Sequence, residues 1–212
     1  AQNLDYIILE VGLGGLFDAT NIFPNYYSVI TKIGLDHENI LGNNLVDIAQ
    51  NKFGIIKPNS IVIHHKLDSQ LNGLIAETQK KTNSKWIPGY SYAKFYETNL
   101  IGPRAQENIS TAIKVFETLG FDFEKHKKAL TKINWPGRMQ PVSWPDLQSP
   151  VYLSGDHNPQ GIESLIEILK SYQYENLHLI VGIGVDKSGD EMLRQILNIP
   201  RVKLYLTETP FK

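Results

Sequence analysis

The chain has 212 residues and a formal net charge of −1, from 21 lysines and arginines against 22 aspartates and glutamates. This balance gives no basic surface for nucleic acid or an anionic membrane, and no apolar run approaches the roughly 20 residues that a membrane-spanning helix needs. The sequence has no cysteine, which excludes disulfides and thiolate metal sites. The length is sufficient for a substantial core, in one large domain or two small ones.

Apolar runs rich in β-branched residues predict strands at Tyr6–Val11, Ser28–Ile33, Ile61–His64, Val151–Leu153, Leu177–Ile183 and Val202–Leu206. Segments with helical periodicity separate several of these runs, at residues 46–53, 108–119 and 161–172. Gly120 follows the second of these segments, where a helix commonly ends on glycine. Apolar strands that alternate with helices are typical of an α/β fold with a mostly parallel sheet covered on both faces.

A segment rich in tryptophan and proline, "NWPGRMQPVSWPDLQSP" at residues 134–150, interrupts this alternation. Each proline pushes the residue before it into extended geometry, so the segment disfavours a helix. We therefore predict that the chain splits near residues 138–150, into a domain of residues 1–140 and a domain of residues 141–212. The pattern of strand, turn and helix restarts at Val151.

Polar side chains follow the first two predicted strands. Glu10 ends the first strand and precedes several glycines, and Asp36 and His37 follow the second strand. If the two strands are parallel neighbours, these side chains share the edge where open α/β sheets usually place their sites. A carboxylate and an imidazole at that edge can bind a divalent cation. Taken singly, Glu10 merely ends a strand and His37 is an ordinary hydrogen-bonding loop residue.

Lys52, Arg138 and the pair His157-Asn158 are equally ambiguous when each is taken alone, and a solvated helix residue is the ordinary interpretation of Lys52. Together the motifs "EVGLGG", "FDATN", "VITKIGLDH", "NKFGIIKP", "WPGRMQ", "HNP" and "GVDKS" resemble, in order and spacing, the folylpolyglutamate synthase/dihydrofolate synthase family of the Mur ligase superfamily. The resemblance covers nearly the whole chain. It implies an α/β fold, with part of a Mur-ligase-type central ATPase domain followed by part of a Rossmann-like C-terminal domain.

The resemblance implies an ATP-dependent amide ligase that adds L-glutamate to dihydropteroate or to folyl(poly)glutamate through an acyl phosphate. Its partners would be these small molecules and ATP, with no nucleic acid or membrane, in a cytoplasmic monomer. Mg²⁺ would neutralise and orient the phosphates, and a monovalent cation is a further cofactor to test. Family members carry a glycine-rich phosphate loop upstream of the region matched here. We therefore expect the chain to be an excerpt that is inactive alone.

The same resemblance implies roles for individual residues. Glu10, His37 and Lys52 would be the catalytic residues that bind Mg²⁺. Lys52 would be carbamylated by CO₂, which converts a repelling ammonium into a carboxylate-like metal ligand. The residues that match nucleotide-binding positions are Asn108, Arg138, His157, Asn158, Asp186 and Lys187.

Several positions carry a residue that the family does not usually have there: Leu16, Asn51, Phe53, Arg104, Ala105, Ser154 and Asp156. Leu16 replaces an arginine, and Ser154 replaces an acid that helps to hold the ribose in the family. Two alternatives stay open beside the folate ligase. One is another ligase of the superfamily, acting on murein peptides or cyanophycin, and the other is a divergent protein kept for binding without catalysis. Leu16 and Ser154 favour the latter. The retained set opposes it: Glu10, His37, Lys52, Asn108 and Arg138.

Overall fold

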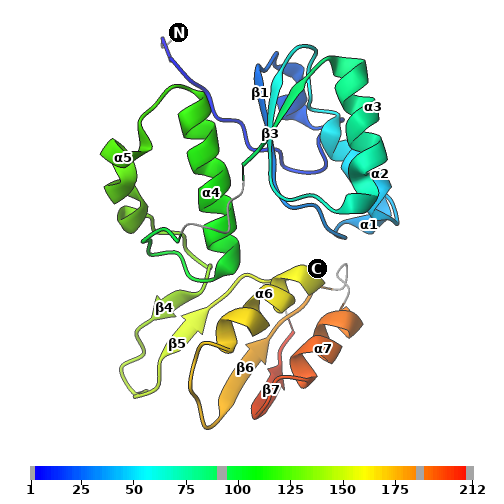
Figure 1. Ribbon diagram of the computed structural model, residues 1–212. Helices are drawn as coiled ribbons and strands as arrows, with labels where there is room; N and C mark the ends of the chain where they lie inside the picture. The colour runs from blue at the N-terminus through cyan, green and yellow to red at the C-terminus, as the bar shows by residue number, and fades with distance from the viewer. Residues whose placement is uncertain (1–2, 90–94, 185–188, 209–212) are drawn as a thin grey trace. The chain divides into compact units, whose positions relative to one another are not determined.

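The computed structural model describes residues 3–89, 95–184 and 189–208 of the chain (Figure 1). Its strands are β1 (Tyr27–Ile30), β2 (Ile61–His64), β3 (Lys85–Pro88), β4 (Gln140–Val142), β5 (Val151–Leu153), β6 (Leu177–Val181) and β7 (Val202–Leu206). Its α-helices are α1 (Glu38–Leu41), α2 (Leu45–Phe53), α3 (Asn72–Thr82), α4 (Pro103–Thr118), α5 (Phe123–His126), α6 (Pro159–Leu169) and α7 (Gly189–Leu197). Single turns of 3₁₀-helix form at Ala19–Ile22 and Ser69–Leu71, and a longer one at Lys127–Lys132.

The chain divides into two compact units. The first comprises residues 1–91 and 110–121, and the second comprises residues 92–109 and 122–212, so that the division falls within α4. No helix in the described part of the chain is both long enough and apolar enough to cross a membrane.

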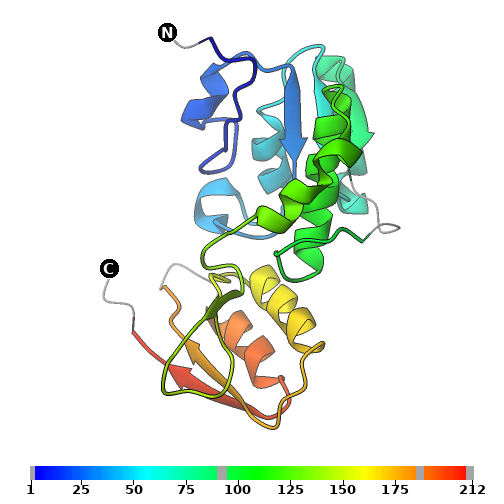
Figure 2. The same ribbon diagram turned by 90° about the vertical axis from the view of Figure 1, so that its left-hand side faces the viewer.

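The first unit is built on a parallel sheet of β1, β2 and β3, in that order. Parallel neighbours need a crossover connection, which α1 and α2 provide between β1 and β2, and α3 provides between β2 and β3. Helices α2 and α3 lie on one side of the sheet and residues 110–118 of α4 on the other (Figures 1 and 2). This sheet is therefore parallel, as the sequence predicts, and its central strand β2 is covered on both faces, since Val62 and Ile63 are both buried. On β1, only the face of Ser28 and Ile30 is buried, and Tyr27 and Val29 are exposed.

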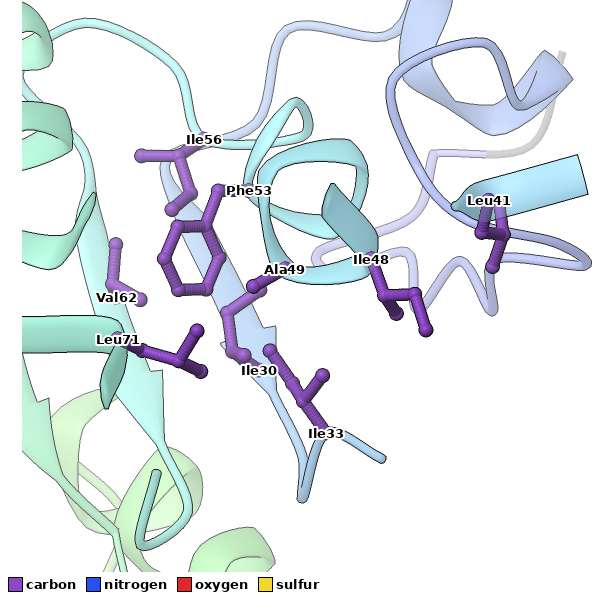
Figure 3. Packing of buried hydrophobic residues seen from close by; sticks show 9 residues of the cluster. All are labelled: Ile30, Ile33, Leu41, Ile48, Ala49, Phe53, Ile56, Val62 and Leu71. Atoms are coloured by element: carbon purple, nitrogen blue, oxygen red, sulfur yellow. The ribbon is translucent and has the colours of Figure 1, made fainter. Parts of the chain in front are cut away.

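Helix α2 is fixed to the sheet by its buried face. It begins after Asn44, whose side-chain oxygen accepts a hydrogen bond from the backbone N–H of Asp47 at 2.9 Å. Its inner face belongs to the core of the first unit, formed by Ile30, Ile33, Leu41, Ile48, Ala49, Phe53, Ile56, Val62 and Leu71 (Figure 3). Phe53 also meets Trp86 edge to face, with ring centroids 5.2 Å apart. Lys52 follows Ile48 by one turn and is thus carried by a helix that the core holds in place.

The second unit contains an antiparallel pair, β4 with β5, and a parallel pair, β6 with β7. Helices α6 and α7 cover one face of the β6–β7 pair (Figure 2). The core of the unit lies beneath them and consists of Met139, Ile162, Leu165, Ile168, Leu169, Met192, Ile196 and Ile199. Among the described residues, side chains on the other face of the pair are exposed, Ile180 at 76% and Tyr205 at 48%. The prediction of a sheet covered on both faces is therefore wrong for this pair.

The predicted elements agree with the structure at most positions. β2, β5 and β7 have the predicted limits, whereas β1 and β6 are shorter than predicted. The predicted strand Tyr6–Val11 is wrong, because residues 3–11 form no strand. A strand is defined by hydrogen bonds to a neighbour, and no described strand pairs with this segment. Its apolar side chains are left exposed, Ile8 at 96%.

The observed division lies elsewhere than residues 138–150. Residues 122–150 group with the second unit, because β4 pairs with β5 across the proline-rich segment and Met139 is buried in that unit's core. The assignment of residues 1–140 and 141–212 to two domains of the family stays a prediction.

Candidate functional site

The glycine-rich stretch after Glu10 folds into a tight turn, here called the glycine turn (residues 12–16), which Asp18 holds together. One carboxylate oxygen, Oδ2, accepts the backbone N–H groups of Gly12 at 3.0 Å and Leu13 at 3.1 Å. The other, Oδ1, accepts the hydroxyl and the backbone N–H of Thr20 at 2.6 and 2.9 Å. Since these donors favour the charged form, the Thr20 hydroxyl first among them lowers the pKa of Asp18 from 3.8 to about 2.

The titration of Asp18 is directly testable. Because its pKa is lower in the folded chain than in the unfolded chain, its hydrogen bonds stabilise the turn fully above about pH 4, and this contribution is lost as the pH falls towards 2. We expect carboxyl-carbon NMR to give a pKa of about 2 for Asp18. In the matched variant Asp18→Asn, the amides of Gly12 and Leu13 should exchange faster at neutral pH. An Asp18 that titrates at its ordinary value would contradict this account.

The glycine turn lies against the last turn of α2. The backbone N–H of Leu16 donates to the carbonyl oxygen of Asn51 at 2.9 Å. Gly14 has a φ of +67°, and a Cβ there would lie 2.5 Å from Oδ1 of Asn51. A Cβ on Gly15 would lie 3.0 Å from the carbonyl oxygen of Lys52. The glycines therefore allow close backbone contact with the helix that carries Lys52.

Lys52 lies in the electrostatic field of Asp36. Its side chain is partly buried, and burial lowers its pKa below 10.5, while the negative charge of Asp36 acts in the opposite direction. Oδ1 of Asp36 accepts the backbone N–H of His37 at 2.9 Å and lies 3.8 Å from Nε2 of the same histidine. His37 precedes α1 in the left-handed conformation, with φ 53° and ψ 38°. The structure thus associates Lys52 and His37 through Asp36, a residue absent from the predicted metal-binding set.

Glu10 lies on the exposed stretch that forms no strand. In the described part of the chain, no strand therefore brings Glu10 to the sheet edge at which the sequence predicts that it meets His37. The described residues include no group of three or more His, Cys, Asp or Glu side chains arranged to hold a metal ion. The predicted set has only two residues of these types, Glu10 and His37, with Lys52 as its third member. Its role in metal binding stays a prediction.

In the second unit, two loops bring Arg138 and His157 into one neighbourhood. The backbone N–H of Gly155 donates to the carbonyl oxygen of Gly137 at 2.7 Å, which joins the loop of Arg138 to the loop after β5. The neighbouring Met139 is buried, whereas the side chains of Arg138 and His157 are exposed. Nδ1 of His157 lies 2.9 Å from the carbonyl oxygen of Gly155. The geometry leaves a guanidinium and an imidazole on adjoining loops.

The loop after β5 continues into the start of α6. Asn158 caps this helix by accepting the backbone N–H of Gly161 at 2.8 Å, so its position after a strand has a structural reason. The hydroxyl of Ser154 donates to Oδ2 of Asp156 at 2.6 Å. A Cβ on Gly161 would lie 2.9 Å from Oδ1 of Asp156. The carboxylate at position 156 is therefore directly hydrogen-bonded to the residue at position 154.

The structure says less about the other predicted nucleotide-binding residues, Asn108, Asp186 and Lys187. Asn108 lies on α4 with an exposed side chain. Asp186 and Lys187 lie outside the described residues. Near Asn108, Gln106 exchanges two hydrogen bonds with the backbone of Tyr96, and Nη2 of Arg104 donates to the carbonyl oxygen of Gln160.

The sequence and the fold were compared with known proteins. No family model matches the chain. A dihydrofolate synthase/folylpolyglutamate synthase of Bacillus subtilis is 32% identical over a 228-residue alignment, which covers 93% of this chain and 52% of that protein. The apo form of L. casei folylpolyglutamate synthase is 26% identical with a TM-score of 0.78, and the match covers 96% of this chain and 55% of that one.

A folylpolyglutamate synthase complex with AMPPCP and folate shares the fold, with a TM-score of 0.74 and 23% identity over 95% of this chain and 62% of that one. The chain spans about half the length of the curated relatives it matches. These matches bear out the resemblance carried by the sequence motifs. By sequence and by fold, the chain therefore belongs to the folylpolyglutamate synthase/dihydrofolate synthase family.

Proposed function

We propose that this chain is part of an ATP-dependent ligase that joins L-glutamate to dihydropteroate, to folyl(poly)glutamate or to both, through an acyl phosphate. The matches to a dihydrofolate synthase/folylpolyglutamate synthase and to a folylpolyglutamate synthase support this activity. Within the chain, the observation that carries the proposal is the contact of the glycine turn with the end of α2, which lies beside Lys52. Residues 1–140 would belong to the ATPase domain and residues 141–212 to the C-terminal ligase domain.

We propose that Glu10, His37 and carbamylated Lys52 hold Mg²⁺ in the intact protein. The state of Lys52 fits this role, because CO₂ adds only to a neutral amine and burial lowers the pKa of this lysine. The carbamate and Glu10 supply the oxygen ligands that a hard cation prefers. His37 supplies a nitrogen, oriented by the Asp36 carboxylate that accepts its backbone N–H. Bound there, Mg²⁺ would neutralise phosphate charge.

We further propose that Arg138, His157 and Asn158 act on the nucleotide, with Asn108, Asp186 and Lys187. The planar donors of a guanidinium match phosphate oxygens in a way that an ammonium does not. The hydrogen bond between Gly137 and Gly155 supports this assignment for Arg138 and His157, because it joins their loops.

An assay of the intact protein tests the proposed activity. With ATP and Mg²⁺, we expect ADP release that requires both L-glutamate and dihydropteroate or a folate. Release that requires a murein peptide or cyanophycin instead would favour another ligase of the superfamily. Binding of AMPPCP without glutamate-dependent release for any of these acceptors would favour a protein that binds without catalysis, the alternative to which Leu16 and Ser154 point.

A further inference from the structure

Asn21 and Lys57 form a tie between two segments of the first unit. The side-chain amide Nδ2 of Asn21 donates to the carbonyl oxygens of Leu16 at 2.9 Å and Gly54 at 3.2 Å. Nζ of Lys57 donates to the backbone oxygen of Asn21 at 2.9 Å and to its Oδ1 at 2.7 Å. One amide therefore joins the glycine turn, the residue that ends α2 and the segment before β2.

The chemistry of this tie fixes the orientation of the Asn21 amide. Its two N–H groups face two carbonyl oxygens, and its oxygen faces an ammonium. In a flipped amide, the NH₂ group of Asn21 would face the ammonium of Lys57, and its oxygen would face the carbonyl oxygens of Leu16 and Gly54. Neither arrangement can form a hydrogen bond. Lys57 is itself partly buried, so removing its ammonium leaves Oδ1 of Asn21 without this charged donor.

The tie acts where the glycine turn meets α2. Leu16 donates its backbone N–H to Asn51 and accepts Nδ2 of Asn21 on its carbonyl oxygen. On the other side, Gly54 ends α2, and a Cβ there would lie 2.5 Å from Cβ of Leu16. The last carbonyls of a helix have no partner within it and need one from outside. In α2 this end of the helix carries Lys52.

We propose that Asn21 and Lys57 are positioning residues, which hold the glycine turn against the last turn of α2 and thereby fix the place of Lys52. This inference rests on the proposed function, because it is Lys52 that the tie would serve. When the tie is cut, the last turn of α2 opens more often and Lys52 is less often in the place needed to bind Mg²⁺. The core around Ile48 and Phe53 keeps the rest of the helix in place.

Hydrogen exchange of the 212-residue chain tests the structural half of the inference. In Asn21→Ala and Lys57→Met we expect the amide of Leu16 to exchange about tenfold faster, the effect of losing about one hydrogen bond, with the amides of β2 unchanged. Asn21→Asp keeps the acceptor for Lys57 but places a carboxylate oxygen against the carbonyls of Leu16 and Gly54. The Leu16 amide should therefore exchange faster in this variant as well. Lys80→Met, on the exposed surface of α3, is the matched control. It should leave the exchange rates of the Leu16 amide and of the β2 amides unchanged.

The functional half is tested in the intact protein. Asn21→Ala and Lys57→Met should lower kcat and raise the Mg²⁺ concentration for half-maximal activity about tenfold, with the KM for glutamate unchanged. Lys57→Arg keeps a positively charged donor at this position and should therefore keep most of the activity that Lys57→Met loses. An unchanged Leu16 exchange rate, or an unchanged Mg²⁺ requirement, would overturn the inference. If Asn21→Ala does not fold, Lys57→Met, which keeps the aliphatic stem, decides the question. Full activity of Lys52→Ala would instead reject the proposed metal site. This outcome can be distinguished from failure of the tie, because the exchange rate of the Leu16 amide does not depend on whether Lys52 binds a metal.

Discussion

Replacement of Lys52 by alanine in the intact protein is expected to lower ligase turnover by on the order of a hundredfold or more. The variant removes the amine that CO₂ would modify, and with it an oxygen ligand of the proposed Mg²⁺ site. The fold should survive, because Lys52 is only partly buried and neighbouring α2 residues, among them Ile48 and Phe53, form the core. Initial rates of ADP release, with ATP and L-glutamate saturating, measure the loss.

Two companion measurements make this result specific. Millimolar acetate or another short carboxylate should partly restore the activity of Lys52→Ala, since it supplies the missing oxygen ligand. Gln50→Ala, on the exposed surface of the same helix, should keep its activity. Carbon-13 NMR with labelled bicarbonate at neutral pH should show a carbamate signal that Lys52→Ala lacks. An active Lys52→Ala enzyme would reject the role of this lysine as a metal ligand.

Local sequence patterns were sufficient for many elements of the fold. β2 and β7 are short apolar runs with β-branched residues, and α2 combines a polar cap at Asn44 with one apolar face. The limits of these elements depend on contacts close in sequence. Gly120 behaves likewise, since its φ of +87° just after α4 is what a residue following a helix end requires.

Other features depend on partners that periodicity cannot identify. The Tyr6–Val11 segment has the composition of a strand, but a ladder needs a neighbour and no described strand provides one. The sequence pattern does not predict helix α3, because its apolar stripe is weak, and in the structure none of its residues is fully buried. The edge strand β3 was missed as well, since it is short and ends in proline.

The candidate site divides in the same way. The motifs name His37, Lys52 and Arg138 as candidates through a family resemblance that the relatives bear out, while the roles of these residues stay predictions. The motifs gave Asp36 no role beside Lys52, and they did not indicate the tie between Asn21 and Lys57. Asn21 and Lys57 are 36 residues apart, and their types occur at many surface positions. Their contact follows from how the glycine turn packs on α2, which only the folded chain shows.

The largest effect on stability is expected for Ile48→Ala. Ile48 is fully buried, at 0% exposure, and lies on α2 one turn before Lys52. Shortening a buried isoleucine to alanine costs about 2–5 kcal/mol of unfolding free energy, through lost apolar burial and the cavity left behind. Urea unfolding followed by tryptophan emission measures this, because Trp86 packs on Phe53 in the same core, whereas Trp135 and Trp144 are more than half exposed.

The same substitution separates the anchoring of α2 from the chemistry of Lys52. Gln50→Ala, again on the exposed surface of α2, should change the urea midpoint little. In the intact protein, at a temperature where Ile48→Ala is still folded, turnover should fall less than in Lys52→Ala, and acetate should not restore it, because the lysine is present but held less firmly. An Ile48→Ala variant as stable as the parent chain would contradict the packing of α2 on β1 and β2. Restoration by acetate would show that the loss had come from the metal ligand and not from the position of the helix.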